Sequence, residues 1–313
     1  MLCTDVVGFA KSAAYLYRTI WLENVDLKSP DRPPIGPMPT CHIVESWDRF
    51  TDAASNPDQA NSRDIHVYSS GTEISLAVNG KQVDAKKKVG GWHGVDKESG
   101  ATPGGVTFAD VAWEPGEITA TCTGVSNGTM THSRHTSKSS AKIVLRVDAP
   151  SPTTGTGKAL LADGQDTALL AAIVVDADGN QDFTSTANIT FKIVSGPGKV
   201  VATHNGNVQN HEPNLAPWHS AYHGLVRGIV RVTQNAAFAP WHRSRLAEID
   251  LDGSIGPTEL IASGKLEAKT IVVEASSPGL VAGQAIIALS TDESTDGVLA
   301  VAAASVTDAL SFE

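Results

Sequence analysis

The sequence is poor in the residues that most often mark a reactive centre. Only three cysteines, Cys3, Cys41 and Cys122, occur among 313 residues. An odd number at such wide spacing is neither a disulfide framework nor a set of zinc ligands. We therefore expect three unpaired, unreactive thiols. Aromatic residues make up only 5% of the chain.

Long apolar runs and an excess of basic residues are also missing. No uninterrupted apolar stretch approaches the roughly 20 residues that a membrane helix needs. The first residues do not form a signal peptide, because Asp5 and Lys11 interrupt them. Lys and Arg number 24 against 34 Asp and Glu, a net charge of −10. Such an acidic surface repels phosphate backbones, so we expect neither nucleic acid nor a membrane as a partner.

Glycine and proline are plentiful, and they separate short runs of valine, isoleucine and threonine. The chain has 28 Gly and 16 Pro, and this pattern is typical of short strands joined by turns. From His42 onward the apolar residues alternate with period 2. The clearest signal is 74–78, which Asn79-Gly80 turns back into 81–85 as a hairpin. These features predict an all-β protein of two immunoglobulin-like sandwiches.

Composition also suggests where the parts begin and end. A helix is expected within residues 6–22, where apolar residues recur at helical spacing. Nothing nearby in the sequence offers a partner for its apolar face. The predicted parts are the helical region at 1–28, a Pro-rich linker at 29–41, one sandwich at 42–148 and a second at 155–313, with an insertion at about 234–268.

The run Lys142–Val147 is assigned to the first sandwich as its last strand. The polar stretch 126–140 is interpreted as a long exposed loop or hairpin tip.

Tryptophan next to histidine is the most suggestive local pattern. Trp92-His93, Trp218-His219 and Trp241-His242 repeat it. An exposed indole beside polar groups suits the apolar face of a sugar ring, whereas packing at a domain seam is the structural alternative. The candidate carbohydrate contacts are Trp92, Trp218, Trp241, His219 and His223.

Other motifs give weaker indications. His219 and His223 have a spacing that would suit a metal on a helix, but Gly224 opens a strand run, so we expect no metal. The segment 153–164 fails the phosphate-loop pattern, and no Gly-x-Ser-x-Gly motif occurs. We expect no cofactor. Asn127 and Asn188 lie in sequons and are glycosylation candidates if the protein is secreted.

Several segments, in order along the chain, resemble the C-terminal part of glycoside hydrolase family 2 proteins of the β-galactosidase type. The first, DVVGFAK at 5–11 followed by an aromatic-rich helix to Trp21, resembles the last helix of the family's (β/α)8 barrel, with Ala10 replacing the usual proline. Further similar segments are HIVESW at 42–47, ISLAVNGK at 74–81, WEPGE at 113–117, ADGQDTALLAAIVVDADGN at 162–180, ITFKIVSGPGKVVATHNGN at 189–207, AYHGLVRGIVRVT at 221–233 and VVEASSPGLVAG at 272–283.

The resemblance implies accessory β-sandwiches of a retaining glycosidase, preceded by one helix left over from the barrel. Such enzymes use two carboxylates about 5 Å apart, and in the family both lie on barrel strands before the last helix. No position here matches either motif, so we assign no catalytic residue and expect this chain to be catalytically silent. The implied partner is the catalytic barrel of a parent enzyme. A stand-alone carbohydrate-binding or structural module is the alternative.

Overall fold

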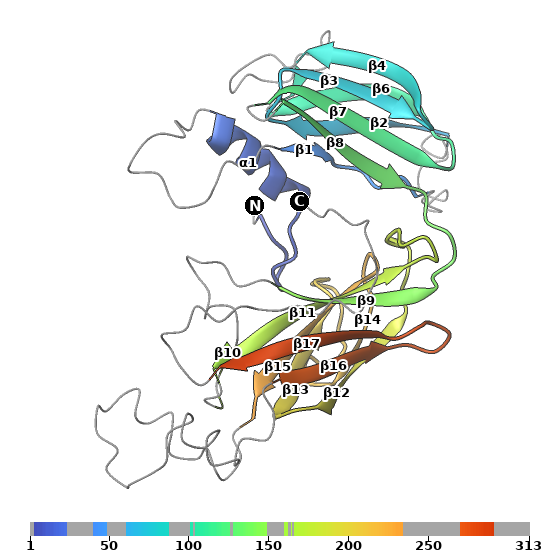
Figure 1. Ribbon diagram of the computed structural model, residues 1–313. Coiled ribbons are helices and arrows are strands. Elements are labelled where there is room, and N and C mark those ends of the chain that lie inside the picture. Colours follow the sequence, from blue (N-terminus) through green and yellow to red (C-terminus); the bar gives the residue numbers. More distant parts are fainter. Residues whose placement is uncertain are drawn as a thin grey trace, which may run out of the picture. The chain divides into compact units, whose positions relative to one another are not determined.

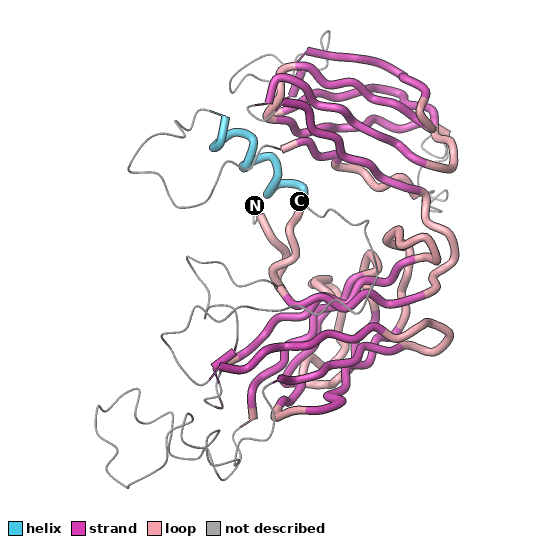
Figure 2. Tube along the Cα trace, in the orientation of Figure 1, coloured by secondary structure: helices cyan, strands magenta, loops and turns pink. Residues whose placement is uncertain are grey.

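The computed structural model describes residues 3–23, 40–48, 61–87, 101–102, 104–125, 128–148, 160–161, 164, 166–233 and 270–290. The chain divides into two compact units, Met1–Lys138 and Ser139–Glu313 (Figure 1). Strands dominate the described part of both units, as Figure 2 shows. The α-helix among the described residues is too short to cross a membrane. The predicted insertion at 234–268 lies outside the described residues.

The first unit is a β-sandwich of two four-stranded sheets, ordered β1-β2-β6-β5 and β4-β3-β7-β8. Its core lies between the sheets and contains Trp47, Phe108 and Ile118, each no more than 1% exposed. The elements are α1 (Ser12–Glu23), β1 (Cys41–Ile43), β2 (Ser62–Ser69), β3 (Glu73–Val78), β4 (Lys81–Lys87), β5 (Ala101–Thr102), β6 (Gly105–Ala112), β7 (Glu117–Val125) and β8 (Gly128–His135).

The hairpin predicted at Asn79-Gly80 is present between β3 and β4. Both turn residues have positive φ, 50° and 75°, as the tight two-residue turn requires. Glycine reaches this conformation without strain because it has no Cβ. The side chain of Asn79 also accepts a hydrogen bond from the Glu117 amide at 2.9 Å, which ties the turn to β7.

The prediction of three unpaired thiols is wrong. Cys41 of β1 and Cys122 of β7 form a disulfide that joins the two sheets of the first unit, while Cys3 is free. The two residues are 81 positions apart. Sequence spacing could not show the pairing, because it depends on two strands of opposite sheets meeting across the core.

Two strand assignments also differ from the sequence predictions. Within the stretch 126–140, expected to be a long exposed loop or hairpin tip, residues Gly128–His135 form β8. This strand pairs with β7 from Glu117↔His135 to Cys122↔Met130 and again at Val125↔Gly128. The run Lys142–Val147 forms β9, but it pairs with β11 (Thr167–Val175) of the second unit. The first sandwich therefore ends before β9, because the apolar residues of β9 complete the second core.

The helix α1 packs against the first sandwich, so the expectation that its apolar face has no partner is wrong. The ring of Tyr15 stacks on His42 of β1 at a centroid distance of 3.6 Å. Leu16 and Thr19 approach Gly104, where an added Cβ would lie 2.7 Å or less from either side chain. Trp21 remains 66% exposed. One side of the helix is thus covered, and another is open.

The second unit is also a two-sheet β-sandwich. Its sheets are ordered β10-β17-β16-β12-β14 and β13-β15-β11-β9. Leu170, Phe191 and Val230 lie in the core between them. The strands are β9 (Lys142–Val147), β10 (Leu160–Leu161), β11 (Thr167–Val175), β12 (Asn188–Ser195), β13 (Gly198–His204), β14 (Trp218–Ser220), β15 (Leu225–Val232), β16 (Thr270–Ser276) and β17 (Gly283–Ser290). The predicted fold class of two immunoglobulin-like sandwiches is confirmed.

Candidate functional site

The described structure contains three of the five candidate carbohydrate contacts. Trp218 and His219 are consecutive residues of β14, and His223 is exposed in the following turn with φ of 52°. Trp92 and Trp241 lie outside the described residues. Of the two sequons, Asn188 is exposed at the start of β12, and Asn127 lies outside the described residues.

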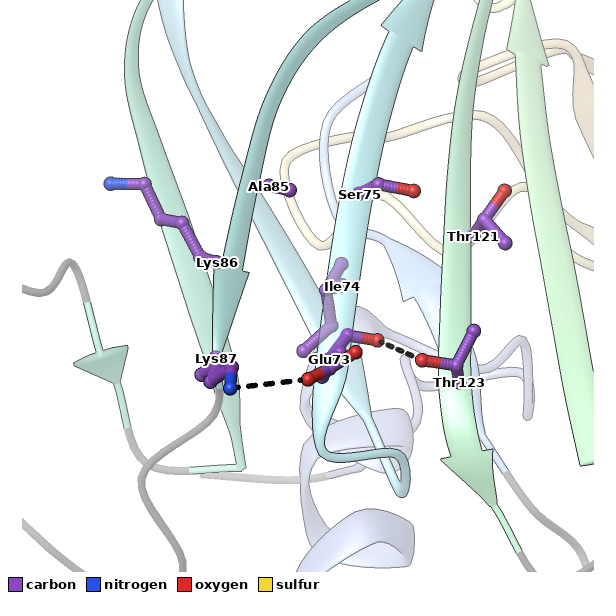
Figure 3. Close-up of a pocket in the computed structure, with 8 residues that line it drawn as sticks. All are labelled: Glu73, Ile74, Ser75, Ala85, Lys86, Lys87, Thr121 and Thr123. Atoms are coloured by element: carbon purple, nitrogen blue, oxygen red, sulfur yellow. Dashed lines mark hydrogen bonds and ion pairs between the residues drawn. The ribbon is translucent and has the colours of Figure 1, made fainter.

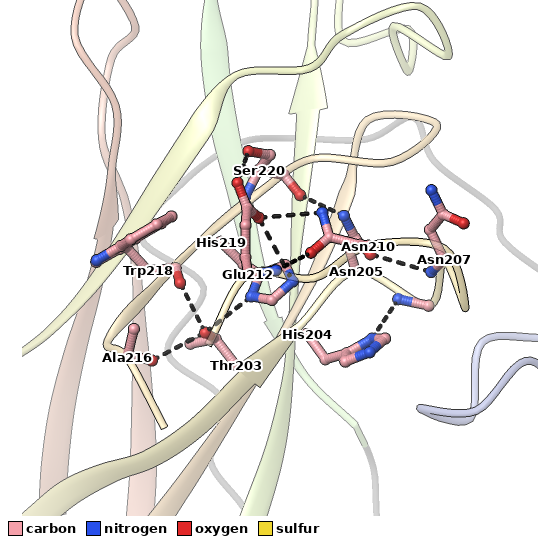
Figure 4. Close-up of polar contacts among 11 residues, drawn as sticks. Thr203, His204, Asn205, Asn207, Asn210, Glu212, Ala216, Trp218, His219 and Ser220 are labelled. Carbon is pink, nitrogen blue, oxygen red and sulfur yellow. Dashed lines mark hydrogen bonds and ion pairs between the residues drawn. The ribbon is translucent and has the colours of Figure 1, made fainter. Parts of the chain in front are cut away.

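Trp218 and His219 point to opposite faces of β14, because successive side chains of a strand alternate. His219 is 0% exposed and faces inward, so it is not available to a surface ligand. Trp218 is half-buried on the outward face. Figure 4 shows its indole directed away from the cluster that contains His219 and Glu212. Of this pair, only the tryptophan is presented to a surface ligand.

The cluster in Figure 4 completes the outer edge of β14. One edge of this strand pairs with β12. On the other edge, the Ser220 amide donates to Glu212 at 2.9 Å, and the Ser220 carbonyl accepts from Asn205 Nδ2 at 2.9 Å. The Trp218 carbonyl lies 2.9 Å from the Thr203 hydroxyl, which is placed to donate to it. Side chains thus satisfy backbone groups that would otherwise be left open at a sheet edge.

Glu212 holds this cluster as a charged carboxylate. It also accepts hydrogen bonds from the Ser220 hydroxyl and from Asn210 Nδ2. Burial alone would raise the pKa of Glu212, but the hydrogen bonds from Ser220 and Asn210 and the nearby His219 outweigh it and lower that pKa. Hydrogen bonding to the charged form favours ionisation.

His219 does not complete a catalytic pair with these groups. Its Nε2 is buried and lies 3.5 Å from Glu212 Oε2, too long for a good hydrogen bond. Burial lowers the pKa of His219 and favours the neutral ring. The Ser220 hydroxyl is bonded to Glu212, and Thr203 lies 3.4 Å from the other ring nitrogen. The arrangement is a structural clamp on β14.

Metal binding has no support in the part of the chain that the structure describes. No three His, Cys, Asp or Glu side chains of those residues gather closely enough to hold an ion.

A shallow hollow of about 280 Å³ lies on the outer face of the first unit (Figure 3). Small side chains on β3, β4 and β7 form its floor, including Ser75, Ala85 and Thr121. The ion pair between Glu73 and Lys87, at 3.4 Å, closes one end. Lys86 also lines the hollow, so its lining carries two lysines against one glutamate.

Sequence reasoning missed a second buried polar cluster, beneath α1. His42 stacks on Tyr15 and lies 4.9 Å from the ring of His132 on β8. Burial first, and then the charge of Arg134, lower the pKa of His42 to about 2 and that of His132 to about 3. His132 Nδ1 accepts a hydrogen bond from the Ile43 amide at 3.1 Å. Both rings are neutral at physiological pH.

Comparisons with known proteins agree with this architecture. Residues 153–237 match the glycoside hydrolase family 2 C-terminal domain 5, and residues 61–131 match a domain of unknown function, DUF4982. A comparison with curated proteins gave no match.

Three similar solved structures cover most of this chain. They are a β-glycosidase from Bacteroides vulgatus (14% identity, 91% of this chain, 27% of that chain, TM-score 0.61), a β-glucuronidase from glycoside hydrolase family 2 (22%, 92%, 22% and 0.58) and a family 2 member from Bacteroides cellulosilyticus DSM 14838 (16%, 91%, 31% and 0.59). At these identities the likeness concerns the fold. The chain spans less than a third of the length of each of these structures.

Proposed function

The chain includes a C-terminal domain of glycoside hydrolase family 2, and from that premise we propose that it is a non-catalytic accessory region of a β-glycosidase. The match of residues 153–237 to a C-terminal domain of this family carries the proposal. The cluster around Glu212 supports it, since the hydrogen bonds of Glu212 and Asn205 with Ser220 hold β14 in place. A retaining glycosidase needs two carboxylates set across the scissile bond, and these belong to the catalytic barrel of the parent enzyme.

We propose that this barrel is the partner of α1. Trp21 is 66% exposed and its ring lies 5.1 Å from that of Tyr17, one helical turn earlier. Tyr17 is half-buried, so Trp21 is the exposed ring of this pair. A large exposed aromatic ring on a helix that is already seated on its other side is typical of an interface. The helix would then link the barrel to the first sandwich, with Tyr15 on the sandwich side.

Assays of the chain on aryl β-glycosides test the accessory role. The β-galactosides are the first substrates to try, because the sequence resemblance points to them. The β-glucuronides come second, because one similar structure is a β-glucuronidase. We expect no turnover by the purified chain on either. Robust turnover by this chain alone would overturn the proposal.

The proposed partner has its own test. The parent's barrel should be produced with residues 42–313 and without them. We expect the barrel that lacks the sandwiches to lose thermal stability. We also expect Trp21→Ala to weaken the association between the barrel and the sandwiches. Val83→Ala, at an exposed apolar residue of β4, is the matched control. Equal stability of the two barrel forms, or equal effects of the two substitutions, would contradict the partnership.

The disulfide indicates the kind of compartment in which the first unit folds. A bond between Cys41 and Cys122 forms and persists in oxidising surroundings, so we propose that the first unit folds outside the reducing cytoplasm. Mass spectrometry of peptides from the native protein, without reduction, tests this. The expected result is a linked pair of peptides containing the two cysteines, and free thiols at both positions would contradict it.

A further inference from the structure

On the outward face of the sheet, the aromatic ring of Trp218 lies at one edge, beside rows of polar side chains. On β12, Thr190 stands directly opposite Trp218, and Asn188 stands opposite Ser220. On the next strand, β16, Ser276 is opposite Thr190. Residues paired in this way on one face have Cβ atoms about 5 Å apart. The indole therefore adjoins hydroxyl and amide groups that belong to a continuous sheet.

A second row extends the polar surface across three strands. Lys192 of β12 is opposite Glu274 of β16, which is opposite Gln284 of β17. Gln284 Nε2 donates to Glu274 at 2.9 Å, so the carboxylate has an oriented neighbour. Lys192 and Gln284 are exposed, and Glu274 is half-buried. At a strand spacing of about 4.8 Å, the surface from β14 to β17 extends about 14 Å.

The chemistry of this face matches a sugar chain. The lysine offers only donors and the ionised glutamate only acceptors, whereas the threonine, asparagine and glutamine side chains offer both. Sugar hydroxyl groups also donate and accept. The positive charge of Lys192 and the negative charge of Glu274 stand opposite each other, so the row does not favour an ion of either sign. The flat indole of Trp218 suits the apolar face of a pyranose ring.

The clamp at the outer edge of β14 keeps Trp218 in place. The backbone of β14 is held on its outer edge by Thr203, Asn205 and Glu212. A binding group on a rigid strand loses little conformational freedom when its ligand arrives, which favours affinity. The clamp therefore has a use beyond stability, as the support of a binding face.

We propose that the outward face of β14, β12, β16 and β17 binds an oligosaccharide, whose β linkage rests on the proposed function. Trp218 stacks on one sugar ring, and Thr190, Lys192 and Glu274 hydrogen-bond to its neighbours. This adds a binding activity to the proposed accessory role. It also makes a prediction about the purified chain that does not require the catalytic barrel, so failure here leaves the accessory role standing.

Calorimetric titration of the full chain tests the face, with a β-linked galactan oligosaccharide and a β-linked glucan oligosaccharide as probes. We expect saturable binding of at least one probe, and Trp218→Ala should weaken it by about tenfold or more. Trp21→Ala is the matched control, because it removes an exposed tryptophan from the other unit. It should leave the affinity unchanged.

A second variant guards against misfolding of the first. Lys192→Ala combined with Glu274→Ala removes polar contacts without altering β14, and it should weaken binding while near-ultraviolet circular dichroism stays native. Absence of binding to both probes by the unmodified chain overturns the proposal. So does equal affinity of the unmodified chain and the folded variants. If the chain binds neither sugar, but the parent's barrel protects the fluorescence of Trp218 from an added quencher, the face is a contact between domains.

Discussion

Acidification should destabilise the first unit through the histidines beneath α1. The pKa of His42 is lowered to about 2 and that of His132 to about 3, chiefly by burial. An unfolded chain exposes both rings, and there a histidine has a pKa of about 6.5. Between these limits the unfolded state binds protons that the folded state cannot. Stability is therefore present above about pH 6.5 and is lost as pH falls toward the folded pKa values.

The magnitude follows from that difference. From about pH 7.5 to about pH 5, protonation favours the unfolded state by about 2 kcal/mol for each ring that stays neutral when folded. The loss is about 4 kcal/mol for the two together, a large part of a typical domain's stability. His66 acts in the opposite direction, since its hydrogen bond to Glu45 raises its pKa and so stabilises the fold on acidification.

A substitution at His42 separates its contribution from those of the other histidines. His42→Phe keeps a ring against Tyr15 and cannot take up a proton, and the His42 Nδ1 that it removes is buried without a hydrogen-bond partner among the described residues. Urea unfolding followed by tryptophan fluorescence, at both pH values, gives the free energy of unfolding. We expect the pH-dependent loss to shrink by about 2 kcal/mol in the variant.

The control is a neighbour that does not titrate. Ile43→Val, in the same strand, should lower the free energy of unfolding by about 1 kcal/mol, equally at the two pH values. His66 is present in every protein compared, so its contribution cancels in the differences. The same pH-dependent loss in His42→Phe and in the unmodified chain would refute the assignment of a buried neutral ring.

Three further predictions concern stability. Replacing both Cys41 and Cys122 by alanine should cost about 4 kcal/mol, because the bridge closes a loop of 81 residues; an unchanged thermal midpoint would contradict this. Glu212→Ala should cost about 2 to 4 kcal/mol by leaving several partners unsatisfied, whereas an effect below about 0.5 kcal/mol in urea would show that water replaces them. Gly116→Ala should cost more than about 1 kcal/mol, since φ is 135° and the new Cβ would lie 2.0 Å from Asn79 Oδ1; a neutral result in the same assay would contradict the turn geometry.

The sequence allowed prediction of features that depend on neighbours along the chain. The alternation at 74–78 and 81–85 is local, and Asn79-Gly80 adopts the positive φ values that its residue types favour. The same dependence on neighbours along the chain limited the assignment of strands such as β8. In β8 the inward positions carry Met130, His132 and Arg134 rather than aliphatic residues, so the pattern looked like an exposed loop.

The candidate site shows the same division. Sequence reasoning identified Trp218 as a possible contact, but it grouped the tryptophan with His219, which faces the opposite side of the strand. It gave no sign of Lys192, Glu274 or Gln284, because these residues meet only through the pairing of three strands. Their juxtaposition depends on register, and register is set by the whole buried face of a sheet.

Residue patterns along the chain were thus sufficient to predict the fold class, the main hairpin and the resemblance to family 2 glycosidases. Those rest on alternation, turn chemistry and the order of motifs. The tertiary structure alone decided the bond between Cys41 and Cys122, the place of β9 in the second unit and the cluster beneath α1. Each of these depends on which strands meet, and that choice is governed by packing between residues far apart in the chain.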